Sequence, residues 1–521
     1  MAVSYTDFGL PHEAAFVMLI AFAQLFTQAA FGQTIAAVNV IGDSFNITQS
    51  GQLSWFSASF SLTVGTFILP SGRWGDAFGT RKLFIIGYAL FALFTLLCGF
   101  AAFCKSSILF QVFRALQGIG PSMLLPNGLA LLGKTYPNGS ARKNFVFCIF
   151  GACAPCGFCV GASITSLFIK WVWWPWSFWC ISAILACSMV ASIFVIPREL
   201  DEVKRADDIN HESKFARQCV EIDLLGTIVG VGALILINVG LNQGAAAGWL
   251  ATRYPIALFI IGAFMFMVFI YIELHPYTQY PIVPLRQLSA NTSFVFACMA
   301  FGWSSFGIWV YYYWSFSLNL RNHSPLVTTA TQCTSAVIGP MAAIFTGFLL
   351  SHFHPRIIIC AAMVAFTVAN ILFATMPVKQ SYWFQSFWSI VVAPFGMDMS
   401  FPSGTILLSD SMPAHNQGVA ASLINTVVNY SIATGLGIAG SVENATNNNG
   451  TDVLKGYRAA WYVAVGLAGA GIAFGVVYVA IGPKLERQAA IAGNAPSIKM
   501  EVPVIRPLSQ DEERPIKESE K

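Results

Sequence analysis

The stretch Gly72-Arg-Trp-Gly-Asp-Ala-Phe-Gly-Thr-Arg-Lys82 decides the fold, because it is a short charged segment between two long apolar ones. Residues 53–71 before it and 83–103 after it carry no charged side chain. Each is about 20 residues long, which lets a helix cross the hydrocarbon core of a bilayer. Glycines allow helix ends to approach closely, and Lys and Arg favour the cytoplasmic side of a membrane. We interpret the stretch as the cytoplasmic turn of a membrane protein.

This turn resembles the signature loop between helices 2 and 3 of the major facilitator superfamily, usually written G-x-L-A-D-R-x-G-R-R/K. The sequence departs from that pattern at Ala77 and Thr80, where the family prefers basic residues. The resemblance implies a gate element in which Asp76 accepts hydrogen bonds from the N-terminus of helix 13, near residues 416–418. The gate residues that match the family pattern are Gly72, Asp76, Gly79, Arg81 and Lys82.

A second motif follows at the expected distance. Arg114-Ala-Leu-Gln117-Gly118-Ile-Gly120 resembles the R-x-x-Q-G-x-G motif of helix 4 in the same family. Two motifs in the right order are more specific than either alone, and the resemblance covers roughly residues 15–482. It implies that Arg114 faces the interior and couples proton movement to the conformational change. The alternative from the residue itself is a structural arginine that holds backbone carbonyl groups.

Composition places the whole chain in lipid. Of its 521 residues 56% are hydrophobic and 10% charged, and the mean hydropathy is +0.65. Such a chain has too few charges to solvate a globule of this size, which excludes a soluble enzyme. We predict an all-α membrane protein with about fourteen spans: 15–38, 52–71, 83–103, 107–132, 145–169, 175–196, 224–243, 254–273, 293–317, 328–350, 357–376, 383–408, 417–440 and 459–482.

The charges of the loops predict the orientation, since Lys and Arg accumulate on the cytoplasmic side. With the N-terminus inside, the inner loops hold 13 basic residues: Arg73, Arg81, Lys82, Lys134, Arg142, Lys143, Arg198, Lys204, Arg205, Lys214, Arg217, Arg286 and Arg356. The outer loops hold 7: Lys105, Lys170, Arg253, Arg321, Lys379, Lys455 and Arg458. Both termini are therefore predicted to be cytoplasmic. Sequons at Asn46, Asn322, Asn444 and Asn449 fall outside and are glycosylation candidates, whereas those at Asn138 and Asn291 fall inside.

An internal repeat divides the chain into two halves. Gly72 and Arg81 recur 275 positions later at Gly347 and Arg356. One helix further on, an offset of 276 relates Gly120, Pro126, Gly128, Leu131 and Leu132 to Gly396, Pro402, Gly404, Leu407 and Leu408. This pattern predicts two parallel six-helix halves related by an axis along the membrane normal, with the substrate route between them.

The repeat also sets the domain boundaries. We predict a cytoplasmic N-terminus (1–14), an N-terminal half (15–196), a cytoplasmic linker (197–223), two inserted helices (224–273), a C-terminal half (274–482) and a disordered cytoplasmic tail (483–521). Twelve core helices and two inserted ones resemble the fourteen-spanner drug:proton antiporter branch. In helix 5 the chain resembles the antiporter motif of that branch. The resembling residues are Gly151, Pro155, Gly157 and Gly161, and Ala154 stands where the motif has Gly.

Asp398 is the other ionisable residue placed deep within a span, and charge there is expensive enough to indicate function. Pro394 and Pro402 flank it, so we expect a broken helix around a proton-carrying carboxyl group that acts with Arg114. The alternative is an Asp that only satisfies local backbone donors. Glu273 is expected at the cytoplasmic interface, and Asp223 as the N-cap of an inserted helix.

Polar and aromatic residues suggest the substrate cavity. Gln24 and Gln28 share one helix face, as do Asn425 and Asn429. Each of these amides either bonds to its neighbours or binds solute, and the candidates are Gln24, Gln28, Gln117, Trp303, Asn425 and Asn429. Aromatic residues 311–314 are interpreted as an interfacial belt. Cys153, Cys156 and Cys159 lie in an apolar helix and are interpreted as packing residues, so no metal is predicted.

The sequence lacks a G-x-x-x-x-G-K-S/T loop, so an ion gradient is expected to drive transport. We predict a non-enzymatic, proton-coupled exporter of small organic molecules in the plasma membrane, with the vacuolar membrane as the alternative. Residues 395–404 and 422–431 resemble the fungal aminotriazole-resistance subgroup. That subgroup includes proteins linked to borate or ammonium, so a small inorganic solute is one alternative and a non-transporting sensor another. No cofactor or nucleic acid is expected. The expected partners are a small-molecule solute, protons and lipid, and the chain is expected to be a monomer.

Overall fold

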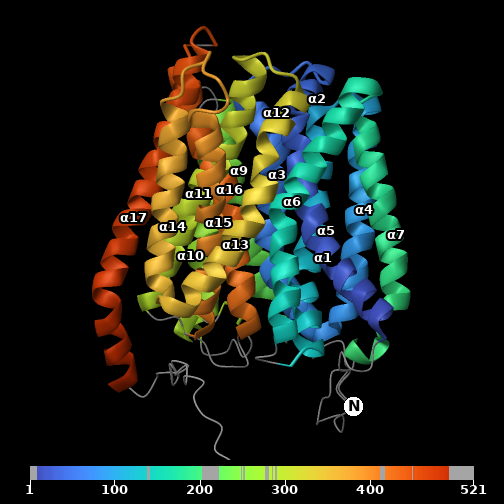
Figure 1. The fold of residues 1–521 in the computed structure, drawn as a ribbon, viewed down its shortest axis with the longest axis vertical. Helices are drawn as coiled ribbons and strands as arrows, with labels where there is room; N and C mark the ends of the chain where they lie inside the picture. The colour runs from blue at the N-terminus through green and yellow to red at the C-terminus, as the bar shows by residue number, and fades with distance from the viewer. Residues whose placement is uncertain are drawn as a thin grey trace, which may run out of the picture.

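All the predicted spans form helices in the computed structural model, shown in Figure 1. The structure describes residues 9–137, 141–201, 222–247, 249, 253–275, 281–283, 285–287, 290–410, 417–448 and 450–491. Within them, 13 helical segments are long and apolar enough to cross a membrane. The 30-residue helix α16 (Gln417–Thr446) is the fourteenth long segment. The prediction of an all-α membrane protein with about fourteen helices is confirmed.

The N-terminal half contains six long helices and a short continuation of the first. Their bounds are α1 Leu10–Ala36, α2 Val38–Ser44, α3 Ser50–Phe78, α4 Thr80–Cys104, α5 Ser107–Thr135, α6 Ala141–Trp171 and α7 Pro175–Val195. A 3-10 turn follows at Arg198–Asp201, and most of the predicted linker lies outside the described residues. The inserted pair is α9 Leu224–Ala247 and α10 Tyr254–Leu274, followed by a 3-10 turn at Leu285–Gln287.

The C-terminal half repeats the first with one helix interrupted. Its bounds are α11 Ala290–Asn319, α12 Pro325–Gln332, α13 Thr334–His352, α14 Pro355–Ala374, α15 Gln385–Asp410, α16 Gln417–Thr446 and α17 Val453–Ile491. Helices α12 and α13 together form a single span, broken at Cys333. Helix α17 continues past the predicted boundary at 482 to Ile491, and residues 492–521 lie outside the described part.

The two halves share one neighbour pattern. In the first, α1 contacts α6, α3 contacts α5, and α4 contacts both α5 and α7. The corresponding pairs in the second are α11 with α16, α13 with α15, and α14 with both α15 and α17. The halves meet along two seams, α3 with α16 and α6 with α13, which the repeat relates to each other. Helix α9 packs against α3 and α16, so the inserted pair covers one of the two seams.

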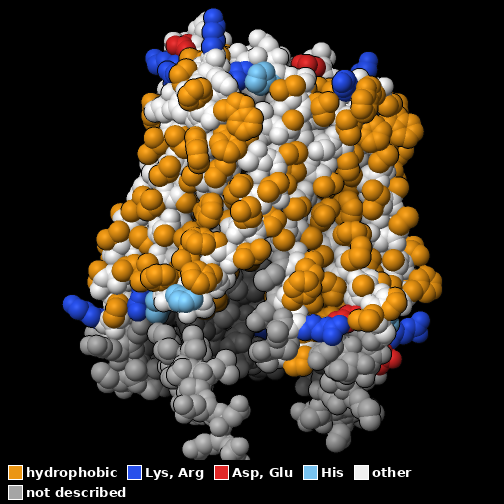
Figure 2. All heavy atoms as spheres, in the orientation of Figure 1, with side chains coloured by type: hydrophobic (Ala, Val, Ile, Leu, Met, Phe, Trp, Pro, Cys, Tyr) orange, Lys and Arg blue, Asp and Glu red, His pale blue; other side chains and the backbone are white. Residues whose placement is uncertain are grey.

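The surface suits a membrane. Figure 2 shows hydrophobic side chains over the middle of the molecule, with Lys, Arg, Asp and Glu gathered at its two ends. In Figure 1 the start of α1 and the end of α17 lie at the same end, as an even number of spans requires. We call that end inner and the opposite end outer, following the orientation predicted from the loop charges.

Two predictions about the interior are wrong. Helix α15 runs unbroken through Pro394 and Pro402, because the surrounding helices support it where the prolines remove hydrogen bonds. The aromatic residues 311–314 form no interfacial belt, because all four are at most 1% exposed. Tyr313 stacks on Phe373 in α14 with ring centroids 4.6 Å apart. Exposed tryptophans lie instead near the outer ends of other helices, at Trp171, Trp176, Trp383 and Trp388.

Candidate functional site

The signature turn is a single residue. Helix α3 ends at Phe78 and α4 begins at Thr80, so only Gly79 lies between them. Its φ of 109° is a conformation that side chains other than glycine rarely adopt, which explains the glycine there. The helices therefore extend further into the charged stretch than hydropathy predicts. Most of the motif side chains belong to the last turn of α3 and the first turn of α4.

Close approach explains two other glycines of the motif. A β-carbon placed on Gly72 would lie 3.0 Å from Ser422 Oγ in α16, so the backbone of α3 here faces the other half of the protein. A β-carbon on Gly75 would lie 1.8 Å from Asn127 Oδ1 in α5. The inner end of α3 is thus packed between α5 of its own half and α16 of the other.

Asp76 is exposed on the last turn of α3, with Lys134 and Arg73 as its attractive electrostatic neighbours. Of the predicted partner segment 416–418, Asn416 lies outside the described residues, and the side chains of the other two are not described either. The role of Asp76 at the inner gate stays a prediction.

Arg73 connects the turn to the inserted helices. Its Nη2 donates a hydrogen bond of 2.8 Å to the backbone oxygen of Pro281, just beyond α10. Asp76, Glu273 and Asp223 attract its charge. Glu273 lies at the inner end of α10, as predicted, and its side chain is 2% exposed because the surrounding segments cover it. Asp223 Oδ1 accepts a hydrogen bond of 3.0 Å from the backbone N–H of Gly226, which confirms it as the N-cap of α9.

Arg81 holds the end of α7. Its Nε donates a hydrogen bond of 2.7 Å to the oxygen of Ile196, and its Nη2 one of 2.7 Å to the oxygen of Ile193. These carbonyl groups belong to the C-terminal end of α7, where no further backbone N–H is available. Lys82, by contrast, is exposed at the inner surface.

Arg114 is fully buried inside the N-terminal half. Its Nε donates to the oxygen of Phe56 at 3.0 Å, its Nη1 donates to Gln117 Oε1, and its guanidinium lies 4.5 Å from the ring centre of Phe60. Gln117 Nε2 in turn donates to Thr95 Oγ1 at 2.7 Å, and Gln117 is itself fully buried. The network joins α3, α4 and α5.

Arg114 and Asp398 are not in contact. No described hydrogen bond, ion pair or electrostatic interaction connects the two side chains. The guanidinium of Arg114 points into the packing of α3 with α5, and its part in proton coupling stays a prediction. The amide of Gln117 is likewise used inside that network.

Asp398 lies at the seam between the halves. A β-carbon placed on Gly339 in α13 would lie 3.9 Å from Asp398 Oδ2 and 2.5 Å from Pro155 Cγ in α6. Asp398 Oδ2 is buried and has no hydrogen-bond partner among the described residues. The carboxyl group is therefore beside the point where the proline of the antiporter motif meets the C-terminal half.

Glycines of the antiporter motif let α6 approach α1. A β-carbon would lie 2.2 Å from the oxygen of Leu25 at Gly157, and 2.0 Å from the oxygen of Ala29 at Gly161. Gly151 differs, because a β-carbon there would meet nothing within 4 Å. Gly157 and Gly161 are therefore required for packing within the N-terminal half, and Pro155 alone of the motif reaches the other half.

The predicted cavity amides differ in their surroundings. Gln24 and Gln28 are half-buried, and the described residues provide no hydrogen-bond partner for either. Asn425 and Asn429 are half-buried in α16, where Asn429 Nδ2 donates to the oxygen of Asn425 at 3.0 Å. Trp303 Nε1 donates to Ser400 Oγ in α15 at 3.2 Å, two residues beyond Asp398. Trp303 is thus packed against α15, the helix that carries Asp398.

The outer end is closed by contacts between the halves. Asn39 Nδ2 donates to Asn319 Oδ1, and Asn319 Nδ2 donates to the hydroxyl of Tyr457 at 2.7 Å. On the α6–α13 seam, the hydroxyls of Ser166 and Thr329 lie 2.8 Å apart. The sequence reasoning missed these residues, because polar side chains in short outer segments carry no motif.

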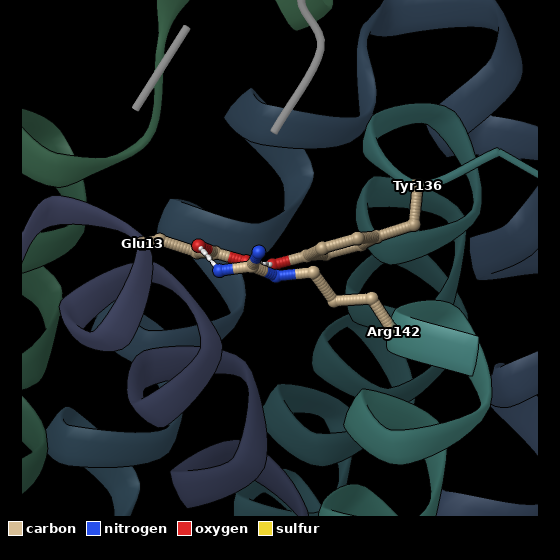
Figure 3. A network of polar contacts seen from close by, with 3 residues as sticks. All are labelled: Glu13, Tyr136 and Arg142. Atoms are coloured by element: carbon tan, nitrogen blue, oxygen red, sulfur yellow. Dashed lines mark hydrogen bonds and ion pairs between the residues drawn. The ribbon is translucent and has the colours of Figure 1, made fainter. Parts of the chain in front are cut away.

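A charged cluster at the inner end was also missed (Figure 3). Glu13 Oε1 accepts hydrogen bonds of 2.8 Å from the hydroxyl of Tyr136 and from Arg142 Nε, and Arg142 Nη2 forms an ion pair with Glu13 Oε2. Burial, and then the hydrogen bond to Glu13, raise the pKa of Tyr136, so its phenol stays protonated. The cluster joins the starts of α1 and α6 to the end of α5.

Three of the four glycosylation candidates lie in the described part. Asn46 and Asn322 are exposed in turns. Asn444 in α16 is exposed, but its Nδ2 donates a hydrogen bond of 3.2 Å to the oxygen of Ala245 in α9. Asn449 and the inner sequon at Asn138 fall outside the described residues.

Comparison with known proteins decides the family. The model of the Major Facilitator Superfamily matches residues 17–438. The chain belongs to the major facilitator superfamily. As a member it is a multi-pass membrane transporter and not an enzyme. The Low affinity ammonium transporter of Saccharomyces cerevisiae is 49% identical over 89% of this chain and 88% of its own length.

Other relatives are named as an efflux pump or a resistance protein. Efflux pump terJ of Aspergillus terreus is 44% identical over 89% of this chain and 87% of that protein. The Aminotriazole resistance protein of Saccharomyces cerevisiae is 36% identical over 88% and 82%. A crystal structure of a POT family transporter in complex with a thioalcohol conjugated peptide superposes with a TM-score of 0.65. It is 14% identical and covers 90% of this chain and 96% of its own, so it supports the fold alone.

Proposed function

We propose that this transporter exports small organic molecules in exchange for protons, by alternating access of its two halves. The observation that carries the proposal is the position of Asp398. Its buried carboxyl oxygen lies beside the contact of Pro155 with Gly339, where the two halves meet. A proton on this group would therefore affect the stability of a contact that must open and close during transport.

The physical basis is the cost of burying charge. An ionised carboxylate without partners is expensive in an apolar seam, whereas the protonated acid costs much less. Binding of a proton to Asp398 thus favours the closed outer seam. Loss of that proton to the inner side favours its separation, which exposes Asp398 to the outside again. Proton entry is linked in this way to the conformational change that moves solute outward.

The solute route is proposed between the halves. Gln24 and Gln28 from α1 and Asn429 from α16 are half-buried, and amides both donate and accept hydrogen bonds. Trp303 adds an aromatic surface for a flat organic molecule. In this proposal the gate residues Gly72, Asp76, Gly79, Arg81 and Lys82 control the inner end, and the transporter draws solute from the cytoplasm across the plasma membrane.

Transport of ammonium is the second candidate. The observation that favours it is the 49% identity to a protein named as a low affinity ammonium transporter. Amide oxygens of the same side chains accept hydrogen bonds from an ammonium ion, and the faces of Trp303 attract cations. The two candidates therefore share one route and differ in its solute.

Proteoliposomes distinguish the candidates. Purified protein is reconstituted in vesicles with an acidic interior, and labelled aminotriazole and methylammonium are added outside. We expect accumulation of aminotriazole beyond that in protein-free vesicles, abolished by a protonophore. Accumulation of methylammonium alone would instead establish the second candidate. The proton coupling is contradicted if the protein speeds the entry of both solutes but neither reaches a higher level inside than in protein-free vesicles.

A further inference from the structure

Two thiols face each other across the seam between the halves. Cys159 is in the middle of α6, and Cys333 is the residue between α12 and α13. The side chains of Cys159 and Cys333 interact directly. Cys159 Sγ also lies 3.7 Å from the oxygen of Gln332 and 3.7 Å from Ser335 Oγ, the residues on either side of that helix junction. Three contacts thus place the thiol of the first half against the broken helix of the second.

The surroundings suit a reaction between the two sulfurs. The side chain of Ser163 interacts with Cys333 as well. Cys333 is half-buried, while Cys159 is 5% exposed. Cys333 keeps backbone hydrogen bonds on both sides of the junction, from its N–H to the oxygen of Thr329 at 2.9 Å and from the N–H of Ala336 to its own oxygen at 3.0 Å, so its side chain is held at the seam. Both cysteines are free thiols in this structure.

We propose that Cys159 and Cys333 are a disulfide-forming modification site that locks the outer end of the transporter shut. A peroxide is the oxidant. The sulfur of Cys333 attacks one peroxide oxygen, which gives a sulfenic acid and one water. The sulfur of Cys159 then attacks the sulfenic sulfur and releases a second water. Two thiols and one hydrogen peroxide thus become one disulfide and two waters.

The consequence is a covalent link between the halves. The α6–α13 seam must open for the cavity to face outward, and a bond from α6 to the α12–α13 junction prevents that. Oxidised molecules therefore stay closed at the outer end and transport stops. This consequence rests on the alternating access proposed above, whereas formation of the bond does not.

A cleavable linker reports the bond directly. A protease site is placed in the linker at 202–221 of the full chain, and the purified protein is treated with hydrogen peroxide, capped with N-ethylmaleimide and cleaved. The halves should migrate together on a non-reducing denaturing gel and separate after dithiothreitol. Cys159→Ser and Cys333→Ser should each separate without reductant. Cys156→Ser is the matched control and should still form the link, because the hydrogen bond of Cys156 Sγ goes to the oxygen of Ala336 at 3.7 Å and not to the α12–α13 junction.

Transport is measured on the same samples. Solute flux of the wild type should fall in proportion to the linked fraction and recover with dithiothreitol, whereas the Cys159→Ser and Cys333→Ser variants should be insensitive to peroxide. Cys159→Ala and Cys333→Ala repeat the test if a serine variant is unstable. Halves that separate in the oxidised wild type, or stay linked in Cys333→Ser, would overturn the site. Linked halves with undiminished flux would overturn the lock but leave the proposed transport function intact.

Discussion

Arg81 is a signature residue of the turn, yet its guanidinium binds the C-terminal end of α7. Two charge-assisted hydrogen bonds to the oxygens of Ile193 and Ile196 contribute about 1.5–3 kcal/mol each. We expect Arg81→Gln to lower the thermal stability of the detergent-solubilised protein, measured by its melting temperature. The exposed neighbour Lys82 provides the control, since Lys82→Gln should change the melting temperature little. Equal melting temperatures for the two variants would show that the α7 contact does not stabilise the fold.

Arg114 illustrates what a motif alone does not tell. The sequence correctly indicates a buried arginine, but it leaves open whether the guanidinium faces solute or backbone. The structure answers this through the contact with Phe56, because α3 supplies a partner that no local pattern encodes, whereas Gln117 belongs to the same motif as Arg114. Asp398 was singled out by the rarity of charge within spans, whereas its position beside Pro155 depends on packing between the halves.

His323 gives the outer end a dependence on pH. Burial, and then the positive charge of Arg321, lower the pKa of His323 from its ordinary value. The folded state therefore binds fewer protons here than the unfolded state, so the contribution to stability is complete above about pH 6.5 and is lost as the pH falls below it.

The prediction is a lower melting temperature at pH 5 than at pH 7.5, with a smaller difference in His323→Gln. The effect should be modest, because the imidazole is only partly buried. His352→Gln, at an exposed position near the inner end, serves as the control and should keep the pH difference of the wild type. An unchanged pH difference in His323→Gln would contradict the assignment.

At the scale of single helices, α6 depends on two of its glycines. Gly161→Ala would place a β-carbon about 2.0 Å from the oxygen of Ala29, so α6 must move away from α1. Overpacking of this kind costs about 1–3 kcal/mol or more. We expect a reduced yield of monodisperse protein in size-exclusion chromatography. Gly151→Ala is the matched control on the same helix, and a similar yield for both variants would refute the packing role.

Hydropathy predicted the helices well and their ends less well. The apolar stretches are long enough to leave no alternative to a span, which is why all fourteen were found. The first turn of α4 and the last turn of α3 are charged, and hydropathy therefore assigned them to a loop. Aromatic residues 311–314 were misplaced because a run of Tyr and Trp has the same composition in a belt as in a core. Only their contacts with α14 and α17 distinguish the two.

For the whole molecule, the repeat predicted the arrangement because duplicated halves keep the same neighbour pattern. The packing of α9 against α16 was not predicted, because its polar contacts, such as Asn238 Nδ2 with Thr434 Oγ1 at 3.1 Å, join segments with no shared motif.

The orientation of the molecule in the membrane remains a prediction from loop charge. A C-terminal epitope tag should resist protease added to intact cells and be cleaved after permeabilisation. Cleavage in intact cells would reverse the orientation of the whole molecule.

The central claim is that the carboxyl group of Asp398 couples proton movement to transport. Gradient-driven accumulation and solute exchange in proteoliposomes test it most directly, in Asp398→Asn and in the control Met397→Leu on the same helix. The amide keeps the shape of the side chain but cannot release a proton in the physiological range. We predict that Asp398→Asn exchanges labelled for unlabelled solute yet builds no concentration gradient, while Met397→Leu does both. An Asp398→Asn protein that accumulates solute as the wild type does, in a manner collapsed by a protonophore, would contradict the account.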